Sequence, residues 1–454
     1  MKLQQIQLKN IHQFANLTLD LSTQEATTVV ILGAQNSGKT SLLKHIYLAL
    51  NWFAHRHKDP RASAIILTDN DIKHDAQTAS FAIEVSYPAE LGNVASDSLA
   101  KARPDYLCRW KWQKSRQNNL TMSISTSELT ELDQLITRYQ KQVLDDALFS
   151  TPCIAYYPVE RFIYEVNIQG KNATSTLAPL HNAYDLTAVN FTTFNKFFEW
   201  YREVHDVENA QAAKLFKQYL DPQQRFTQSH HFEDALSSIE QAYRLSAQRS
   251  ISSLRTALQT VLPEVEDIEL DYTPKLALTV KHQGKTTAFL QLPQATRIWI
   301  GLVGDLVRRL CLLNPQSLYP CLEGEGIVLI DSIELLLDAE HLQHVLPRLK
   351  RAFPRLQFIV SSLNTEILDN AEDTQCFQLQ DGRLHPLHLH QHQQQLDQLY
   401  QNIMSPISET SKMTHAESQP LTPEQLSQHF SQLSTVQQQQ LLAEFTQHIQ
   451  QKEN

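Results

Sequence analysis

The sequence predicts an α/β fold, with a mixed sheet and flanking helices, and three observations near its start carry that prediction. Residues 28–32 form a short apolar, β-branched run, which is typical of a buried parallel strand. The following residues, Gly33 to Thr40, fit the pattern G-x-x-x-x-G-K-[ST]. Apolar residues then recur at helical spacing, namely Leu42, Leu43, Ile46 and Leu50. A strand, a glycine-containing loop and a helix therefore follow one another in the order that a phosphate-binding loop requires.

Each part of this loop has a chemical role toward a nucleotide. Gly33 and Gly38 allow the backbone to curl so that its N–H groups point at phosphate oxygens, and the helix N-terminus adds partial positive charge. Lys39 can reach the β- and γ-phosphates, and the Thr40 hydroxyl can ligate Mg²⁺. We therefore expect ATP and Mg²⁺ to bind, with these nucleotide-binding residues in the loop: Gly33, Gln35, Asn36, Ser37, Gly38, Lys39, Thr40 and Ser41. The alternative is a chance match in an ordinary strand, turn and helix.

Composition limits the class of protein. The 454 residues are enough for two or three domains. We expect no membrane span, because the sequence has no run of about 18 apolar residues, and no signal peptide. Five scattered cysteines without C-x-x-C spacing indicate a reducing, cytoplasmic location, and they argue against a disulfide framework and a zinc cluster. A formal net charge of −10 does not favour a large nucleic-acid surface, although a local basic patch stays open.

Alternating residues predict strands on either side of the loop. We expect two strands in residues 1–21 and a hairpin in residues 106–125 that turns near residues 117–119. In that hairpin, alternation places Arg109, Lys111 and Gln113 on one face and Cys108, Trp110 and Trp112 on the other. Basic residues between tryptophans can bind nucleic acid. A solvated face opposite a packed face is the commoner explanation, and we prefer it.

The middle of the chain is predicted to be largely helical. Residues 126–148 and 190–262 have helical patterns, and an aromatic stripe in the second is expected to be core: Phe194, Phe197, Phe198 and Tyr201. A strand at residues 154–157 leads to Arg161, which could contact phosphate or a neighbouring subunit, or form a structural ion pair. Strands return at residues 269–272 and 276–280.

A second nucleotide-binding element is expected late in the chain. Residues 326–331 form a buried-strand pattern that ends in Asp331, a Walker B carboxylate that would hold Mg²⁺ together with Thr40. A helix is expected in residues 341–351, and a further strand and turn at residues 357–365. A hairpin in residues 377–387 should turn at Asp381-Gly382.

These stretches together resemble a known family. The opening L-K-N-I-H-Q-F at residues 8–14 and the phosphate loop resemble RecF/SMC/OLD-like ABC-type ATPases. Residues 156–161, the F-F-E-W-Y-R-E-V-H-D-V-E-N segment at residues 197–209, and residues 301–331 resemble ATPases of Septu-type and retron-associated anti-phage defence systems. The resemblance covers residues 1–400 in outline. It implies an ABC-type P-loop domain that works as a dimer, with ATP held between the loop of one subunit and the signature of the other.

The resemblance also implies a division of the chain into four parts. Residues 1–180 would be the N-terminal half of the ATPase domain, and residues 181–265 a helical insertion or arm. Residues 266–400 would be the C-terminal half, with a degenerate signature and Walker B, and residues 401–454 a linker and helical tail. The tail has two capping-box helix starts after a Ser/Thr/Pro-rich stretch, which predicts a helical hairpin. Docking on a partner or second subunit, and packing on its own domain, both stay open for this hairpin.

At four places the sequence departs from the chemistry of these relatives. A Ser-Asp-Gly-Glu type signature is replaced by residues 293–296, which read Pro-Gln-Ala-Thr, and a Leu-His-Leu-His-Pro type stretch by residues 335–339. Ser332 stands where the catalytic Glu is expected, and a hydroxyl cannot take a proton from water near neutral pH. Leu363 stands where the relatives have a switch histidine. Glu334 is a candidate substitute base, which would share the face of Ser332 if the strand continued.

The resulting hypothesis is an ATP-binding pseudo-ATPase subunit of a bacterial anti-phage defence complex. It would form a homo-oligomer or pair with an intact ATPase, and would regulate or scaffold a separate effector such as a nuclease. The alternatives are an active DNA-stimulated ATPase or DNA clamp, and a scaffold that does not use nucleotide. A histidine cluster at His385, His388, His390 and His392 could bind metal, but it lacks a Cys or carboxylate partner at ligand spacing.

Overall fold

The computed structural model describes most of the chain. The described residues are 1–22, 27–64, 67–94, 106–116, 125–166, 183–184, 194–220, 248–273, 275–370 and 373–387. The chain divides into two units, Met1–Leu389 and His390–Asn454. The second unit, which includes the expected tail hairpin, lies outside the described residues, as do the turn at residues 117–119, His388, His390 and His392.

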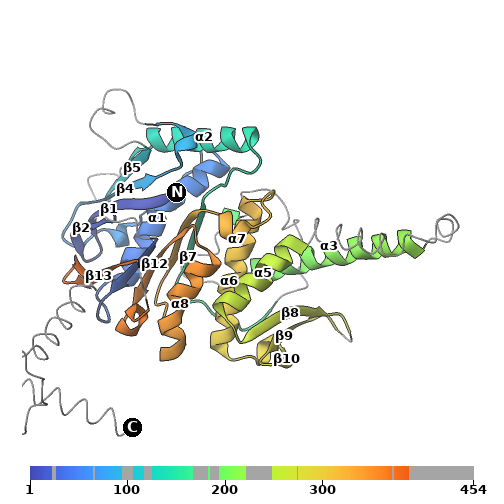
Figure 1. The fold of residues 1–454 in the computed structure, drawn as a ribbon. Coiled ribbons are helices and arrows are strands. Elements are labelled where there is room, and N and C mark those ends of the chain that lie inside the picture. The colour runs from blue at the N-terminus through green and yellow to red at the C-terminus, as the bar shows by residue number, and fades with distance from the viewer. Residues whose placement is uncertain are drawn as a thin grey trace, which may run out of the picture. The chain divides into compact units, whose positions relative to one another are not determined.

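A six-stranded sheet, with strand order β14-β13-β3-β12-β11-β7, positions the candidate site (Figure 1). Five of its strands are parallel: β3 (Thr28–Leu32), β7 (Cys153–Tyr157), β11 (Gly326–Ile330), β12 (Leu356–Ser362) and β13 (Thr374–Gln380). The edge strand β14 (Arg383–Leu387) pairs antiparallel with β13 through the turn at Asp381 and Gly382, so that predicted hairpin is confirmed. Every residue of β3, β11 and β12 is buried, as expected for parallel strands covered on both faces.

A second sheet of five antiparallel strands has the order β2-β1-β4-β5-β6. Its strands are β1 (Lys2–Ile11), β2 (Phe14–Asp20), β4 (Thr78–Ser86), β5 (Leu107–Ser115) and β6 (Ser125–Glu128). β1 and β2 confirm the two strands expected in residues 1–21. On β5 the side chains of Cys108, Trp110 and Trp112 are buried. On the opposite face, Arg109 lies 3.5 Å from Glu84 and Lys111 lies 3.6 Å from Glu128, so the packed and solvated faces are confirmed.

Helix α1 (Lys39–Lys58) connects the two sheets. It contacts β7, β11 and β12 of the six-stranded sheet, and also β4 and α2 (Thr130–Asp145). The indole Nε1 of Trp110 donates to the carbonyl of Ala49 in α1, at 2.9 Å. The helix that follows the phosphate loop is therefore held on both sides, and its N-terminus is fixed relative to the ends of the parallel strands.

The remaining elements build a helical region with a small sheet. Its helices are α3 (Asn195–Leu220), α5 (Gln248–Val261), α6 (Gln294–Leu313), α7 (Pro320–Glu323) and α8 (Ala339–Ala352). Its strands, β8 (Val265–Asp271), β9 (Ala277–His282) and β10 (Lys285–Ala288), pair antiparallel in the order β10-β9-β8. Short 3₁₀ turns are η1 (Asp69–Asp71), η2 (Ala89–Leu91), η6 (Phe289–Gln291) and η7 (Thr365–Leu368).

The aromatic stripe at the start of α3 is core, as predicted. Phe194, Phe197, Phe198 and Tyr201 are all buried. Phe197 packs on α6 at Gly304, where an added Cβ would lie 2.4 Å from the phenyl ring. Glycine at this position therefore permits the close approach of α3 and α6. Among the described residues, no helix combines the length and the apolar character that a bilayer span needs.

Candidate functional site

The loop between β3 and α1 adopts the strand, loop and helix arrangement that the sequence predicts. Asn36 and Gly38 have φ angles of 62° and 101°, so the backbone turns through the left-handed region twice. A Cβ at Gly38 would lie 1.8 Å from Nε2 of Gln13, and that amide donates to the carbonyl of Ser37 at 3.0 Å. The turn between β1 and β2 is thus held against the loop. The side chains of Gln35, Asn36 and Thr40 are exposed.

Lys39 lies at the start of α1 and bends over the loop. Its ammonium group donates to the carbonyls of Gly33 at 2.7 Å and Ala34 at 2.9 Å, and the residue is only 7% exposed. Burial lowers the pKa of Lys39, while the negative charges of Glu334 and Asp331 act in the opposite direction. The lysine and these two carboxylates therefore belong to one electrostatic cluster.

Asp331 follows β11 and is fully buried. Its Oδ1 accepts a hydrogen bond from the Ser361 hydroxyl at the end of β12, at 2.6 Å. Its Oδ2 is buried without a hydrogen-bond partner in the part of the chain that the structure describes. A buried carboxylate oxygen without a partner is destabilising, and a cation would satisfy it. Because parallel strands end at one edge of a sheet, Asp331 and the loop after β3 share that edge, and their donor set fits a nucleotide phosphate with Mg²⁺.

Glu334 would share a face with Ser332 only if the strand continued beyond Asp331, and the turn after β11 shows that it does not. β11 ends at Ile330 and Ser332 has a φ of 45°, so the strand does not continue and Glu334 does not share a strand face with Ser332. The Glu334 carboxylate nevertheless faces the cluster. Its Oε1 accepts from the backbone N–H of Leu363 at 3.1 Å, and its Oε2 is buried without a partner among the described residues.

Arg161 is buried inside this chain, with 1% of its surface exposed. Contact with a neighbouring subunit, one of the alternatives for this residue, therefore does not fit. Its guanidinium donates to the carbonyls of Pro158 and Ser332, each at 2.8 Å, and to the carbonyl of Asp331. Burial lowers its pKa to about 10, and the charges of Asp331 and Glu334 oppose that effect. The structural alternative expected an ion pair, but the contacts are to backbone carbonyls, which fix the turn that carries Asp331.

Three degenerate stretches remain: Leu363, residues 293–296 and residues 335–339. Leu363 contacts Glu334 through its backbone N–H, and in residues 335–339 the N–H groups of Leu335 and Leu337 donate to the carbonyls of Ser332 and Glu334. Leu363 is 51% exposed at the end of β12. Pro293 precedes α6, and no side chain caps this helix. Within the described ranges, no hydrogen bond joins residues 293–296 to residues 33–41.

The sequence reasoning missed Gln13 and a cluster of His12, His45 and Asp71. Gln13 lies in the quoted opening stretch, but only the fold brings it to the loop. The three cluster residues are far apart in the sequence, and no ligand spacing reveals them. Their side-chain ligand atoms lie within 4.8 Å of one another.

Comparisons with known proteins find a matching family model and several similar chains. A family model described as "AAA domain" matches residues 5–266. The "Retron Vc95 probable ATPase" of Vibrio cholerae serotype O1 biovar El Tor is 27% identical over 395 residues, which cover 82% of this chain and 72% of the relative. The "Retron Ec83 probable ATPase" of Escherichia coli is 25% identical over 407 residues, covering 83% and 71%. Among solved structures, an Smc head bound to the C-winged helix domain of ScpA is 13% identical, with a TM-score of 0.46, and covers 86% of this chain and 100% of that one.

Proposed function

The chain belongs to the AAA domain family, and we propose that it is an ATP-binding subunit of a bacterial anti-phage defence complex in which hydrolysis is weak or absent. The observation that carries the nucleotide proposal is the unpartnered Oδ2 of buried Asp331, at the sheet edge that also bears the phosphate loop. Lys39, whose pKa responds to Asp331, supplies the matching cation.

In this proposal the loop residues 33–41 bind the phosphates of ATP. Lys39 would exchange its two carbonyl partners for phosphate oxygens, because an ionised acceptor forms the stronger hydrogen bond. Thr40 and Asp331 would hold Mg²⁺, which neutralises phosphate charge when it is bound. Ser361 would keep the Asp331 carboxylate oriented through the bond to its Oδ1.

Weak hydrolysis is proposed from the residues around Asp331. Ser332 offers a hydroxyl where a carboxylate is needed, and loss of a general base typically lowers the rate by ~10²–10⁴-fold. Leu363 offers an apolar side chain where the resemblance implies a switch histidine, and residues 293–296 have Pro293 and Ala295 where a signature would have its serine and its glycine. These departures support a subunit that responds to ATP binding more than to ATP turnover.

The defence role is proposed from the relatives, which are named as probable ATPases of retrons. The chain would act in the cytoplasm as a homo-oligomer, or in a heteromer with an intact ATPase, and would regulate or scaffold a separate effector such as a nuclease. An intact partner would supply the signature that residues 293–296 lack. The division at residues 180, 265 and 400 remains part of this proposal.

One observation favours a second candidate, an active ATPase. Glu334 has a buried, unpartnered Oε2, and its charge acts on Lys39 more strongly than that of Asp331 does. A carboxylate in this position could orient an attacking water in place of the missing glutamate. DNA-stimulated turnover that depends on Glu334 would support this candidate.

Nucleotide binding is tested by the stability of the purified chain with Mg-ATP. A ligand at 100 times its Kd stabilises the folded state by about 2.7 kcal/mol, so we expect a clear rise in melting temperature for the wild type. Lys39→Ala and Asp331→Asn should abolish most of that rise, whereas Arg109→Ala, on an exposed sheet face, should keep it. If the wild type shows no shift at saturating Mg-ATP, the nucleotide-independent scaffold is the better description.

A further inference from the structure

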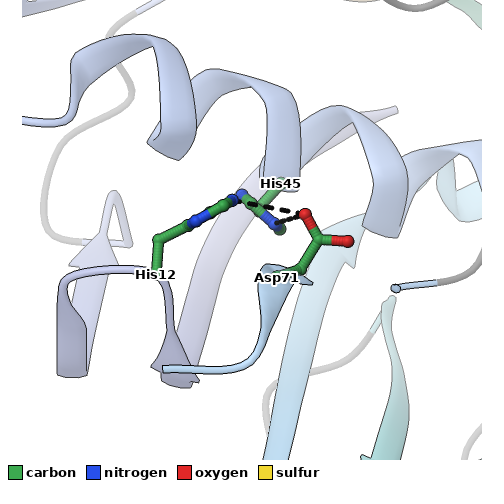
Figure 2. Close-up of side chains that lie close together, drawn as sticks. All are labelled: His12, His45 and Asp71. Atoms are coloured by element: carbon green, nitrogen blue, oxygen red, sulfur yellow. Dashed lines mark ion pairs between the residues drawn. The ribbon is translucent and has the colours of Figure 1, made fainter. Parts of the chain in front are cut away.

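Three side chains from separate segments converge beside the phosphate-loop helix (Figure 2). His12 comes from the turn between β1 and β2, His45 from α1, and Asp71 from η1. The Nε2 atom of His12 lies 3.2 Å from Oδ1 of Asp71, and Nε2 of His45 lies 3.7 Å from the same oxygen. Two imidazoles and a carboxylate thus direct one ligand atom each toward a common point.

These separations fit a tetrahedral metal ion. Zn²⁺ binds imidazole nitrogen and carboxylate oxygen at about 2.0–2.2 Å, so neighbouring ligand atoms in a tetrahedral site lie roughly 3.3–3.5 Å apart. The two imidazole–carboxylate separations bracket that value, and all three ligand atoms lie within 4.8 Å of one another. The two imidazole rings meet at 71° with centroids 5.2 Å apart, so they approach from different directions instead of stacking.

His45 is oriented as a metal ligand. Its Nδ1 donates to the Ser41 carbonyl at 2.6 Å, and a carbonyl can only accept, so in the neutral ring Nε2 carries a lone pair. The His45 side chain is 0% exposed, and Nε2 has no hydrogen-bond partner among the described residues. A backbone carbonyl on the second nitrogen is the arrangement that commonly fixes metal-binding histidines. The buried, unpartnered nitrogen is the independent observation that points to a ligand.

Asp71 is also held so that one oxygen is available. Its Oδ2 accepts from the backbone N–H of Thr68 at 2.6 Å and from the Thr68 hydroxyl at 2.7 Å, which leaves Oδ1 for the histidines. Burial and the neighbouring His45 lower the pKa of His12. Together, Oδ1 of Asp71 and the two imidazole nitrogens form the donor set that a metal ion would take.

The backbone holds these groups together before any ligand arrives. The N–H of His12 donates to the Asp71 carbonyl at 2.9 Å, and the N–H of Lys73 donates to the Asn10 carbonyl at 2.9 Å. Asn10 and His12 have φ angles of 52° and 45°, which are strained for residues with a side chain. The His12 side chain is 37% exposed, so the cluster borders solvent, from which an ion can reach it.

We propose that His12, His45 and Asp71 form a binding site for a divalent transition metal of the Zn²⁺ class. Two imidazole ligands favour Zn²⁺ and its neighbours over Mg²⁺, which prefers oxygen. This site is separate from the nucleotide proposal and does not depend on it. Bound metal would join the β1–β2 turn to α1, and that turn carries Gln13, which contacts the phosphate loop.

The test uses the full-length chain, untagged, stripped with a chelator and free of nucleotide. Zn²⁺ alone is titrated in competition with a chromophoric chelator, and bound metal is counted by elemental analysis. The wild type should hold one equivalent that His12→Gln or Asp71→Asn removes or weakens by at least ~10–100-fold, the loss typical when even supporting residues of metal sites are changed. His45 is left unchanged in both variants, because its side chain is fully buried and its substitution could prevent folding.

Two controls make the result decisive. His74→Gln removes a histidine whose side chain is 96% exposed, 3.2 Å from Asp75, and it should leave the tight equivalent unchanged. A variant with His388, His390 and His392 replaced by Gln removes the other histidine-rich stretch, and it should also keep that equivalent. His12→Gln lies at the surface and is the deciding variant if Asp71→Asn, which also loses a Thr68 contact, fails to fold. Wild-type protein that binds no tight equivalent, or His12→Gln protein that binds as the wild type does, would overturn the proposal.

Discussion

Arg161 shows how one buried residue fixes the turn that carries Asp331 through contacts to backbone carbonyls. Its guanidinium joins the end of β7 to the turn after β11 through three carbonyls, two of which belong to Asp331 and Ser332. The orientation of the Asp331 carboxylate thus depends on a buried cation that is itself held by the backbone. Lys39 acts on the same turn from the start of α1, and Glu334 lies within the turn.

At this scale we expect Arg161→Ala to destabilise the fold. The substitution leaves buried carbonyls without donors, and each such group typically costs ~1–3 kcal/mol, so the free energy of unfolding should fall by about 2–4 kcal/mol. The matched control is Arg109→Ala, whose side chain is 43% exposed and pairs with Glu84, and which should change stability by less than about 1 kcal/mol. Urea denaturation of both variants measures the difference. Equal effects would mean that the carbonyl contacts of Arg161 contribute little.

At the scale of elements, α6 is fixed by packing and by a buried charge cluster. α3 approaches it closely through Phe197 at Gly304. Asp305 follows Gly304 in α6, and its carboxylate lies 3.0 Å from Arg308 and 2.7 Å from Arg309. The carboxylate also accepts a hydrogen bond from the hydroxyl of Tyr157, on β7, at 3.0 Å. Burial acts to raise the pKa of Asp305, but the charges of Arg309 and Arg308 lower it to about 2.

This cluster makes the stability of the chain depend on pH with a definite sign. The folded pKa of Asp305 is below its ordinary value of 3.8, so its contribution is fully present above that value and is lost as the pH falls toward about 2. Asp305→Asn should therefore destabilise the fold by ~3–5 kcal/mol near pH 7, because it leaves buried arginines without their carboxylate. The difference in free energy of unfolding between wild type and variant, measured by urea denaturation, should become smaller below about pH 4. A difference that stays constant into that range would contradict this assignment.

At the scale of the whole molecule, the sequence predicted those elements whose signal lies within a short stretch of neighbouring residues. The β3–loop–α1 unit, the β11 strand before Asp331, the hairpin of β13 and β14, and the aromatic core at Phe197 follow from periodicity and turn residues. These features depend on neighbours in the chain, which is why one sequence was enough to find them.

The parts that sequence reasoning missed depend on contacts between distant segments. Glu334 was expected to share a face with Ser332 only if β11 continued that far. The strand ends at Ile330, and the left-handed backbone at Ser332 begins a turn. The carbonyl partners of Arg161 carry no sequence signal, because every residue has a carbonyl group. The cluster of His12, His45 and Asp71 forms only when the β1–β2 turn, α1 and η1 come together, and the sequence near each residue carries no signal of it.

The central claim for the whole molecule is that it binds ATP and hydrolyses it weakly or not at all. The most direct measurement is phosphate release by the purified full-length chain at saturating Mg-ATP, with and without DNA, using Lys39→Ala as the blank. We expect release that is indistinguishable from the blank, because Ser332 cannot act as a base and Leu363 cannot contact a γ-phosphate. Turnover clearly above the blank that disappears in Glu334→Gln would contradict the claim and identify Glu334 as the substitute base.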